Sequence, residues 1–352
     1  ANAAWILEEL LGGDLGAEVG FASGTRVVAE LHEVDGLRID EHQRPIDGDD
    51  VVLITGGAGE IGERVARHLA SSLPKAIVLV GRKERTARID RILDEISAHG
   101  LRAQYIACDI TESGALSRAT RGIGAELGPV TIAIHAAGVI EDAVSSKKTV
   151  DSGARVMNAK VLGLQSILHA CDGLRDLVLF SSWAGRFGNA GQVDYSAAND
   201  LLDRIAIAGL GSQRVVSIAW PPWASTSMVR SIPAALERAM RREGVDFIGD
   251  AEGLEVFDAI FGRGLRGLVV VGRALPAREA RTRSTLVFAP TQHTYLEHHR
   301  LEGRPVVPLA SVMDLVAWNL SGTREADEAI ELSHLELVRG IFGGDSAEVR
   351  IH

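Results

Sequence analysis

Seven short runs of apolar residues alternate with stretches of helical periodicity between residues 51 and 275. The runs are VVLIT at 51–55, AIVLV at 76–80, QYIAC at 104–108, VTIAI at 130–134, LVLF at 177–180, VVSIA at 215–219 and LVVVG at 268–272. Strands continuous in Val, Ile and Leu, each followed by a helix, are typical of a parallel sheet covered on both faces. The sequence therefore predicts the α/β class, with a doubly wound parallel sheet.

The chain on either side of this block has different patterns. Apolar residues at helical spacing between Trp5 and Leu11 predict a helix, and a hairpin follows with strands at 18–21 and 26–31 and a turn at Ser23-Gly24. Residues 276–290 read as an Arg-rich linker, and 291–352 as the start of another unit, with a helix at 311–320. We expect 51–275 to be the main domain and 1–50 to be too short to fold alone.

Composition excludes several classes of function. The 352 residues carry a formal net charge of −10, whereas a nucleic-acid surface needs a clustered basic face. No apolar run is long enough to span a membrane, and no secretory signal is visible, so a cytoplasmic location is expected. Cys108 and Cys171 lie far apart in apolar surroundings and predict reduced core thiols. We expect no metal, membrane or nucleic-acid partner.

The first strand runs directly into a glycine-rich turn that opens a helix. Val51–Thr55 is followed by Gly56-Gly57-Ala58-Gly59-Glu60-Ile61-Gly62, which contains GxGxxG in its strand-to-helix context. Such glycines let the backbone approach a pyrophosphate, while the helix N-terminus offers unpaired N–H groups. The motif predicts a Rossmann-like dinucleotide site, with a merely tight turn as the alternative. The candidate contacts on this turn are Thr55, Gly57, Gly59, Glu60, Ile61 and Gly62.

The end of the second strand indicates which dinucleotide is used. NAD enzymes place a carboxylate there for the ribose 2′-hydroxyl, but this strand ends in Val80-Gly81-Arg82-Lys83. Arg82 would bind a 2′-phosphate, so NADPH is favoured over NADH, unless Arg82 is only a solvated loop charge. Asp109, at the end of the third strand, is a candidate for the adenine amino group, with a turn role as the equal alternative.

A Ser and a Tyr stand where their side chains can meet at one carbonyl oxygen. Ser182 follows the fifth strand, and Tyr195 begins a helix thirteen residues later, in Tyr195-Ser196-Ala197-Ala198-Asn199. In most short-chain dehydrogenases a Lys follows the Tyr by four residues. Here Asn199 has that place, and Lys160 lies 35 residues before Tyr195.

With these residues the chain resembles the ketoreductase domains of type I polyketide and polyunsaturated fatty-acid synthases, members of the short-chain dehydrogenase/reductase superfamily. The resemblance covers 51–275. It includes His135-Ala136-Ala137-Gly138 after the fourth strand and the loop Trp220-Pro221-Pro222-Trp223 after the sixth. It implies cofactor contacts from Ala136, Ala137, Gly138, Pro222, Lys160 and Tyr195. Pro221 departs from the family's usual Gly-Pro.

The resemblance implies an enzyme that uses NADPH to reduce a 3-oxoacyl thioester on an acyl carrier protein, beside neighbouring synthase domains. Tyr195 would donate a proton to the developing alkoxide, and the Lys160 ammonium would favour the phenolate left behind. Ser182 would bind the substrate oxygen, and Asn199 would position Lys160 or a water. As single residues, Ser182 could instead cap a turn and Lys160 be a solvated charge.

Two further segments bear on product and partner. Ile140-Glu141-Asp142 stands where reductases giving 3R alcohols usually have Leu-Asp-Asp, and Phe187 replaces the Trp of the opposite class, so the resemblance implies a 3R product. Residues 228–242 predict one amphipathic lid helix with arginines that could receive the acidic carrier protein. A solvated helix face is the alternative.

The C-terminal stretch resembles the opening of a hotdog-fold dehydratase. His299, Gly303 and Pro308 fit the HxxxGxxxxP pattern of synthase dehydratases, which makes His299 a possible base. In such dehydratases the acid comes from a second hotdog half, which this sequence does not contain. The alternative is therefore a histidine without a catalytic role.

Two other functions remain open. The chain could be a catalytically silent, reductase-like structural module, or a fragment whose principal chemistry is dehydration. The complete set of Ser182, Tyr195, Lys160 and Asn199 argues against the first, and the partial dehydratase pattern argues against the second.

Overall fold

The computed structural model describes residues 19–22, 25–29, 31–32, 46–242, 245–272, 300–301 and 304–305. One compact unit spans Val34–Pro276 and contains the main sheet. The short strands near either end of the chain belong to a second unit.

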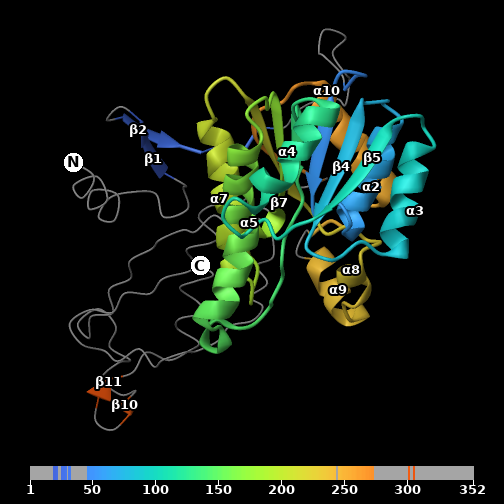
Figure 1. The fold of residues 1–352 in the computed structure, drawn as a ribbon. Helices are drawn as coiled ribbons and strands as arrows, with labels where there is room; N and C mark the ends of the chain where they lie inside the picture. Colours follow the sequence, from blue (N-terminus) through green and yellow to red (C-terminus); the bar gives the residue numbers. More distant parts are fainter. Residues whose placement is uncertain are drawn as a thin grey trace. The chain divides into compact units, whose positions relative to one another are not determined.

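The main sheet has seven parallel strands in the order β5-β4-β3-β6-β7-β8-β9 (Figure 1). The strands are β3 Val51–Thr55, β4 Ala76–Gly81, β5 Arg102–Ala107, β6 Ile132–His135, β7 Asp176–Ser182, β8 Arg214–Trp220 and β9 Gly267–Val270. The chain winds outward in one direction from β3 and in the other from β6, so the strand order reverses between these two neighbours. The predicted doubly wound α/β fold is confirmed, although the third strand ends at Ala107, before Cys108 and Asp109.

Helices cover both faces of the sheet. They are α2 Glu60–Ala70, α3 Ala87–Ser97, α4 Ala115–Leu127, α5 Val150–Ala170, α6 Trp183–Phe187, α7 Val193–Ala208, α8 Ser227–Arg230, α9 Ala234–Arg242 and α10 Asp250–Gly262, with a 3-10 turn η1 at Ser145–Lys147.

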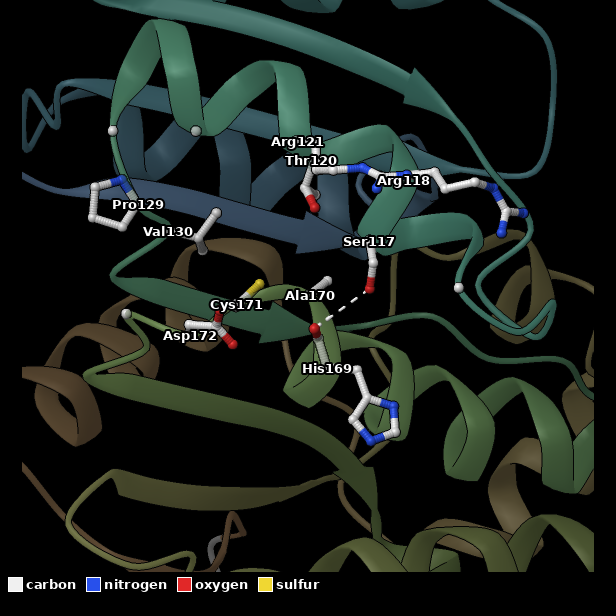
Figure 2. Close-up of a pocket in the computed structure, with 14 residues that line it drawn as sticks. Ser117, Arg118, Thr120, Arg121, Pro129, Val130, His169, Ala170, Cys171 and Asp172 are labelled. Carbon is white, nitrogen blue, oxygen red and sulfur yellow. Dashed lines mark hydrogen bonds between the residues drawn. The ribbon is translucent and has the colours of Figure 1, made fainter.

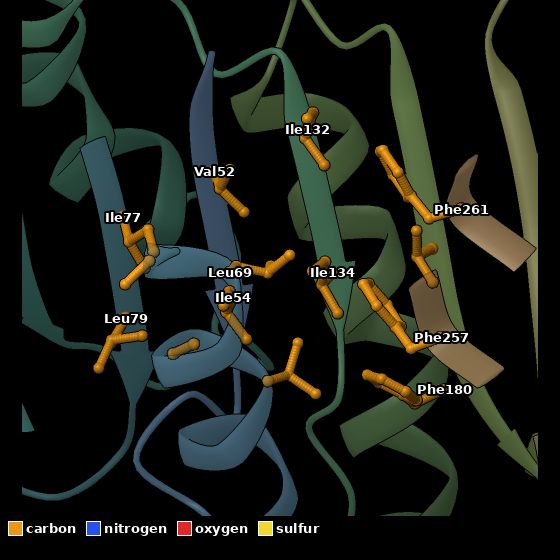
Figure 3. Close-up of a cluster of buried hydrophobic side chains, with 14 of the residues drawn as sticks. Val52, Ile54, Leu69, Ile77, Leu79, Ile132, Ile134, Phe180, Phe257 and Phe261 are labelled. Atoms are coloured by element: carbon orange, nitrogen blue, oxygen red, sulfur yellow. The ribbon is translucent and has the colours of Figure 1, made fainter. Parts of the chain in front are cut away.

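Each strand divides its side chains between two buried cores, because successive residues point to opposite faces. In β3, Val52 and Ile54 join the core under α2, α3 and α10, which is drawn in Figure 3. Val51 and Leu53 join the core under α4, α5 and α7. Burial on both faces explains why the strands read as continuous apolar runs.

The segment predicted as one lid helix at 228–242 forms two helices. The helix α8 ends at Arg230, and α9 begins at Ala234, after Pro233. A helix cannot pass smoothly through this point, since proline has no N–H to donate and its ring crowds the preceding turn.

The strands outside the main unit are short. In agreement with the predicted hairpin, β1 Val19–Ala22 pairs antiparallel with β2 Thr25–Val28. Just after His299, β10 Arg300–Leu301 pairs with β11 Arg304–Pro305. The predicted helices at 5–11 and 311–320, the linker at 276–290 and His299 itself lie outside the described residues. None of the helices in the described ranges combines the length and the apolar character that a bilayer crossing requires.

The turn between β3 and α2 leaves no room for side chains at its glycines. Gly56 has φ of +70°, and a Cβ there would lie 2.8 Å from the Ala137 nitrogen. A Cβ on Gly57 would lie 2.8 Å from the Ile54 carbonyl oxygen, and one on Gly62 would overlap the Gly56 carbonyl. The glycines therefore allow α2 to start directly against the end of the sheet.

We expect Gly62→Ala to destabilise the domain by about 1–3 kcal/mol, because the added methyl group meets backbone atoms that cannot move aside. Gly122→Ala is the matched control: Gly122 is an exposed residue of α4, with nothing within 4 Å of an added Cβ. It should stabilise the domain by about 0.5–1 kcal/mol through helix propensity. Urea unfolding followed by circular dichroism measures both, and equal effects would contradict the close approach at Gly62.

Candidate active site

The candidate site lies at the carboxyl edge of the sheet. Thr55, His135 and Ser182 are the last residues of β3, β6 and β7. Because parallel strands all end at the same edge, these residues from distant parts of the sequence meet there, next to the point where the strand order reverses.

Ser182, Tyr195 and Asn199 form one side-chain cluster. Ser182 ends β7 and N-caps α6, its hydroxyl accepting a 3.2 Å hydrogen bond from the Ala184 N–H. Tyr195 lies in the first turn of α7. Burial raises the pKa of its hydroxyl, hydrogen bonds with the Ser182 and Asn199 side chains oppose that rise, and Asp142 adds to it. The phenol therefore stays protonated at neutral pH and can act as a proton donor.

Asn199 follows Tyr195 by one helical turn and is fully buried. Its Nδ2 donates a 2.8 Å hydrogen bond to the Tyr195 carbonyl, and its Oδ1 is buried without a hydrogen-bond partner among the described residues. A buried, unpartnered oxygen in this position is free to accept a bond from a water or from an ammonium group.

Lys160 projects from α5 into the same region and is only 4% exposed. Its Nζ donates to the Phe180 carbonyl, two residues before Ser182. Burial lowers its pKa to about 8, and the Asp203 carboxylate opposes the decrease. The side chain is therefore mainly an ammonium at pH 7. A Cβ on Gly138 would lie 3.3 Å from its Cε, so Gly138 leaves the room that Lys160 occupies.

His135 joins three elements below the site. Its Nδ1 lies 2.7 Å from the Thr55 hydroxyl, and its Nε2 lies 2.9 Å from the Lys160 carbonyl oxygen. Burial, reinforced by the nearby Lys160 charge, lowers its pKa to about 3, so the ring is neutral. A carbonyl can only accept, so Nε2 carries the proton and Nδ1 accepts from Thr55. The Thr55 hydroxyl, predicted to contact the cofactor, thus holds His135.

The predicted cofactor residues surround the glycine turn. Ala136 donates its N–H to the Thr55 carbonyl at 3.1 Å and, with Ala137, packs directly against Gly56. Pro222 follows β8, and its carbonyl accepts from the Ile248 N–H at 3.0 Å. The N-terminus of α2, which starts in this turn of glycines and has no side-chain cap, fits a pyrophosphate.

Glu60 has a partner that the sequence did not reveal. Its carboxylate accepts from the N–H of Ser227 at 2.9 Å and from the Ser227 hydroxyl at 3.0 Å. These bonds lower its pKa. One turn later, Arg64 contacts Asp250 at 2.6 Å. The first turns of α2 are thus tied to the starts of α8 and α10.

Two other predicted contacts lie at the ends of β4 and β5. Arg82 is exposed in the loop after β4. The Asp109 carboxylate accepts from the N–H and the hydroxyl of Thr111, at 2.9 and 2.7 Å. These bonds are those of a turn, and the contact with the adenine amino group stays a prediction.

Sequence reasoning missed the polar groups that fix the segment after β6. Lys148 forms a nearly buried ion pair with Asp194 at 2.6 Å. Gln192 donates to the Asp142 carboxylate at 2.9 and 3.0 Å, and Arg155 pairs with Glu141 at 2.7 Å. These pairings join residues 14 to 50 positions apart, which no local pattern identifies.

A separate hollow of about 590 Å³ lies between α4 and α5 (Figure 2). Ser117 donates to the His169 carbonyl at 3.4 Å beside it, and burial raises the pKa of Cys171 in its wall to about 12, which makes the thiol unreactive. None of the predicted site residues lines it. Within the described ranges, no cluster of three or more His, Cys, Asp or Glu residues could hold a metal ion.

Comparisons with known proteins agree with this geometry. The family model for the KR domain matches residues 50–225. Polyketide synthase GfsB of Streptomyces halstedii is 38% identical over 192 residues, which are 52% of this chain and 3% of that protein. Mycoketide-CoA synthase of Mycobacterium tuberculosis is 36% identical over 219 residues, which are 59% of this chain and 5% of that protein. The chain thus spans a small part of each synthase.

A solved structure is similar over most of the described part. PlmKR1, a ketoreductase from the first module of phoslactomycin biosynthesis in Streptomyces sp. HK803, has a TM-score of 0.62 and 30% sequence identity. The match covers 77% of this chain and 64% of that chain. This chain therefore belongs to the KR domain family, the ketoreductase domains of type I polyketide synthases, which have the short-chain dehydrogenase/reductase fold.

Proposed function

We propose that the chain reduces a 3-oxoacyl thioester, carried by an acyl carrier protein, to the 3R-hydroxyacyl thioester with NADPH. The observation that carries the proposal is the cluster of Ser182, Tyr195 and Asn199 with the buried Lys160, beside a glycine turn shaped for a dinucleotide.

The chain's own residues can complete the reduction. A bound nicotinamide supplies a hydride to the 3-oxo carbon, which builds negative charge on the substrate oxygen. Ser182 donates a hydrogen bond to that oxygen, and Tyr195 donates the proton that turns it into a hydroxyl. The Lys160 ammonium stabilises the phenolate that remains, and Asn199 orients the start of α7 through the Tyr195 carbonyl.

The choice of NADPH is supported by the loop after β4. No carboxylate stands at Gly81-Arg82-Lys83, and Arg82 is exposed and available for a 2′-phosphate. The Tyr105 hydroxyl donates to the Lys83 carbonyl at 2.6 Å, which fixes the path of this loop.

The 3R product is supported by the segment after β6. Asp142 accepts hydrogen bonds from Gln192, which lies three residues before Tyr195. The neighbouring Glu141 instead forms an ion pair with Arg155. Phe187, which is 38% exposed and packs edge-on against Trp183 at 5.1 Å, stands where the opposite class carries Trp.

The carrier protein and the neighbouring synthase domains are proposed partners. The arginines of 228–242 differ in availability: Arg230 lies 3.8 Å from Glu60, and Arg241 pairs with Glu237 at 2.9 Å. Arg238 and Arg242 are exposed on α9 and could meet acidic residues of a carrier. A dehydratase role for 291–352, with His299 as base, remains a separate proposal.

We expect Tyr195→Phe to lower kcat by roughly 10²–10⁴-fold, because the proton donor is lost while the ring remains. The assay follows NADPH consumption with a short 3-oxoacyl thioester, and chiral chromatography should show the 3R alcohol. Ser117→Ala, which removes a hydroxyl beside the separate hollow, should keep kcat. Unchanged turnover in Tyr195→Phe would refute the proposed proton donor. Tight NADPH binding without turnover in the unaltered chain, on both free and carrier-bound substrate, would favour a silent structural module.

We expect Arg82→Ala to weaken NADPH binding roughly 10- to 100-fold, because one charge-assisted contact to the 2′-phosphate is lost. NADH binding should change little, since it has no such phosphate. Arg91→Ala, an exposed arginine on α3, is the matched control. Fluorescence titration of the unaltered chain and both variants with each dinucleotide measures the six affinities. Parallel losses for NADPH and NADH would show that Arg82 does not select the phosphate.

A further inference from the structure

A buried carboxylate lies behind the proposed catalytic cluster. Asp203 is 2% exposed and follows Tyr195 by eight residues and Asn199 by four, so the three share one face of α7. This face points into the core rather than to solvent. Asp203 therefore lies two helical turns beyond Tyr195, on the same buried face of α7.

Asp203 has only one strong hydrogen-bond partner among the described residues. Its Oδ1 accepts from the hydroxyl of Ser217, a fully buried residue of β8, at 2.6 Å. Its Oδ2 is buried and has no hydrogen-bond partner in the same part of the chain. Burying a carboxylate with an unsatisfied oxygen costs stability, which an apolar residue would avoid.

The charges around Asp203 come from few groups. The charges that act on its pKa are those of Lys160 on α5 and Asp200 on α7. The strands β7 and β8 contribute the hydroxyls of Ser181 and Ser217, and β9 carries no titratable side chain. Among these, Lys160 is the buried cation, and the sheet places it close to Asp203. Its Nζ binds the Phe180 carbonyl of β7, while Asp203 binds Ser217 of β8. Ser217 is the strand partner of Leu179, the residue before Phe180, so the two side chains reach neighbouring positions on adjacent strands.

The two buried charges depend on each other. Burial raises the pKa of Asp203 to about 6, and burial lowers that of Lys160 to about 8, while each group opposes the shift of the other. Near pH 7 both are therefore ionised. Without the carboxylate, the desolvated ammonium would lose its proton at a lower pH.

We propose that Asp203 is a positioning residue whose buried carboxylate keeps the Lys160 ammonium charged beside Tyr195. It acts through Lys160 and contacts neither substrate nor cofactor. The role in turnover rests on the proposed reductase function, but the effect on Lys160 does not.

The decisive variant is Asp203→Asn, which keeps an acceptor for Ser217 and removes the charge. The pKa of Lys160 is measured directly by NMR of the chain labelled with ¹⁵N at lysine Nζ, with Lys160→Met assigning the signal, and no substrate is needed. We expect the Lys160 pKa to fall by about one unit. An unchanged Lys160 pKa would overturn the proposal, whether or not the chain proves to be a reductase.

Turnover supplies the second readout. The alkaline limb of the kcat profile should move to lower pH by about one unit, with a roughly fivefold loss at pH 8. Stability at pH 7 should stay equal or increase, because the ionised carboxylate is the disfavoured form in the fold. A lower kcat with an unmoved pH profile, or a moved Lys160 pKa with an unmoved kcat profile, would reduce Asp203 to a structural residue.

Two further variants serve as a control and as a replacement in case Asp203→Asn does not fold. Asp200→Asn is the matched control, since Asp200 lies on the same helix and pairs with Arg204 at 2.8 Å near the surface. It should leave both the Lys160 pKa and the kcat profile unchanged. If Asp203→Asn does not fold, the double variant Asp203→Leu, Ser217→Ala removes both members of the hydrogen bond and leaves no polar atom unpaired. It should lower the Lys160 pKa in the same way, and a failure to do so would count equally against the proposal.

Discussion

The Lys160 ammonium is 4% exposed, and a cation with so little water around it needs polar groups from the protein to remain charged. The Phe180 carbonyl and the more distant Asp203 carboxylate provide them. His135, whose Nε2 binds the backbone of Lys160, would repel the ammonium if it were protonated. Burial keeps this ring neutral, so it can fix α5 to β3 and β6 without adding a second positive charge.

The parallel sheet brings these groups to one edge, where the glycine turn packs closely against the sheet. Gly56 and Gly57 allow the turn to pack against Ala136 and the end of β3, at distances that no side chain would permit. The helix α2 starts in this turn, and Glu60 and Arg64 in its first turns hold the segment between Ser227 and Asp250. The glycine turn, α2 and the segment from Ser227 to Asp250 are therefore one connected structure. The hollow between α4 and α5 is lined by none of these residues.

Much of this could be predicted from the sequence. The strands, the doubly wound order and the glycine turn follow from continuous apolar runs and from glycines at fixed spacing, because local backbone geometry and burial on both faces impose those patterns. Ser182, Tyr195, Asn199 and Lys160 were found by spacing and by resemblance to ketoreductases. The break between α8 and α9 could also have been predicted, since Pro233 marks it.

The sequence by itself determined which residue types stand at the ends of the strands and the starts of the helices. Only the tertiary structure decided what those residues contact. Thr55 binds His135, Glu60 binds Ser227, and Asp203 faces the core near Lys160, because strands and helices far apart in the chain end at the same edge of the sheet. A carboxylate on a helix reads as a surface charge in the sequence; burial and the nearest opposite charge, which give Asp203 its properties, exist only after the chain has folded.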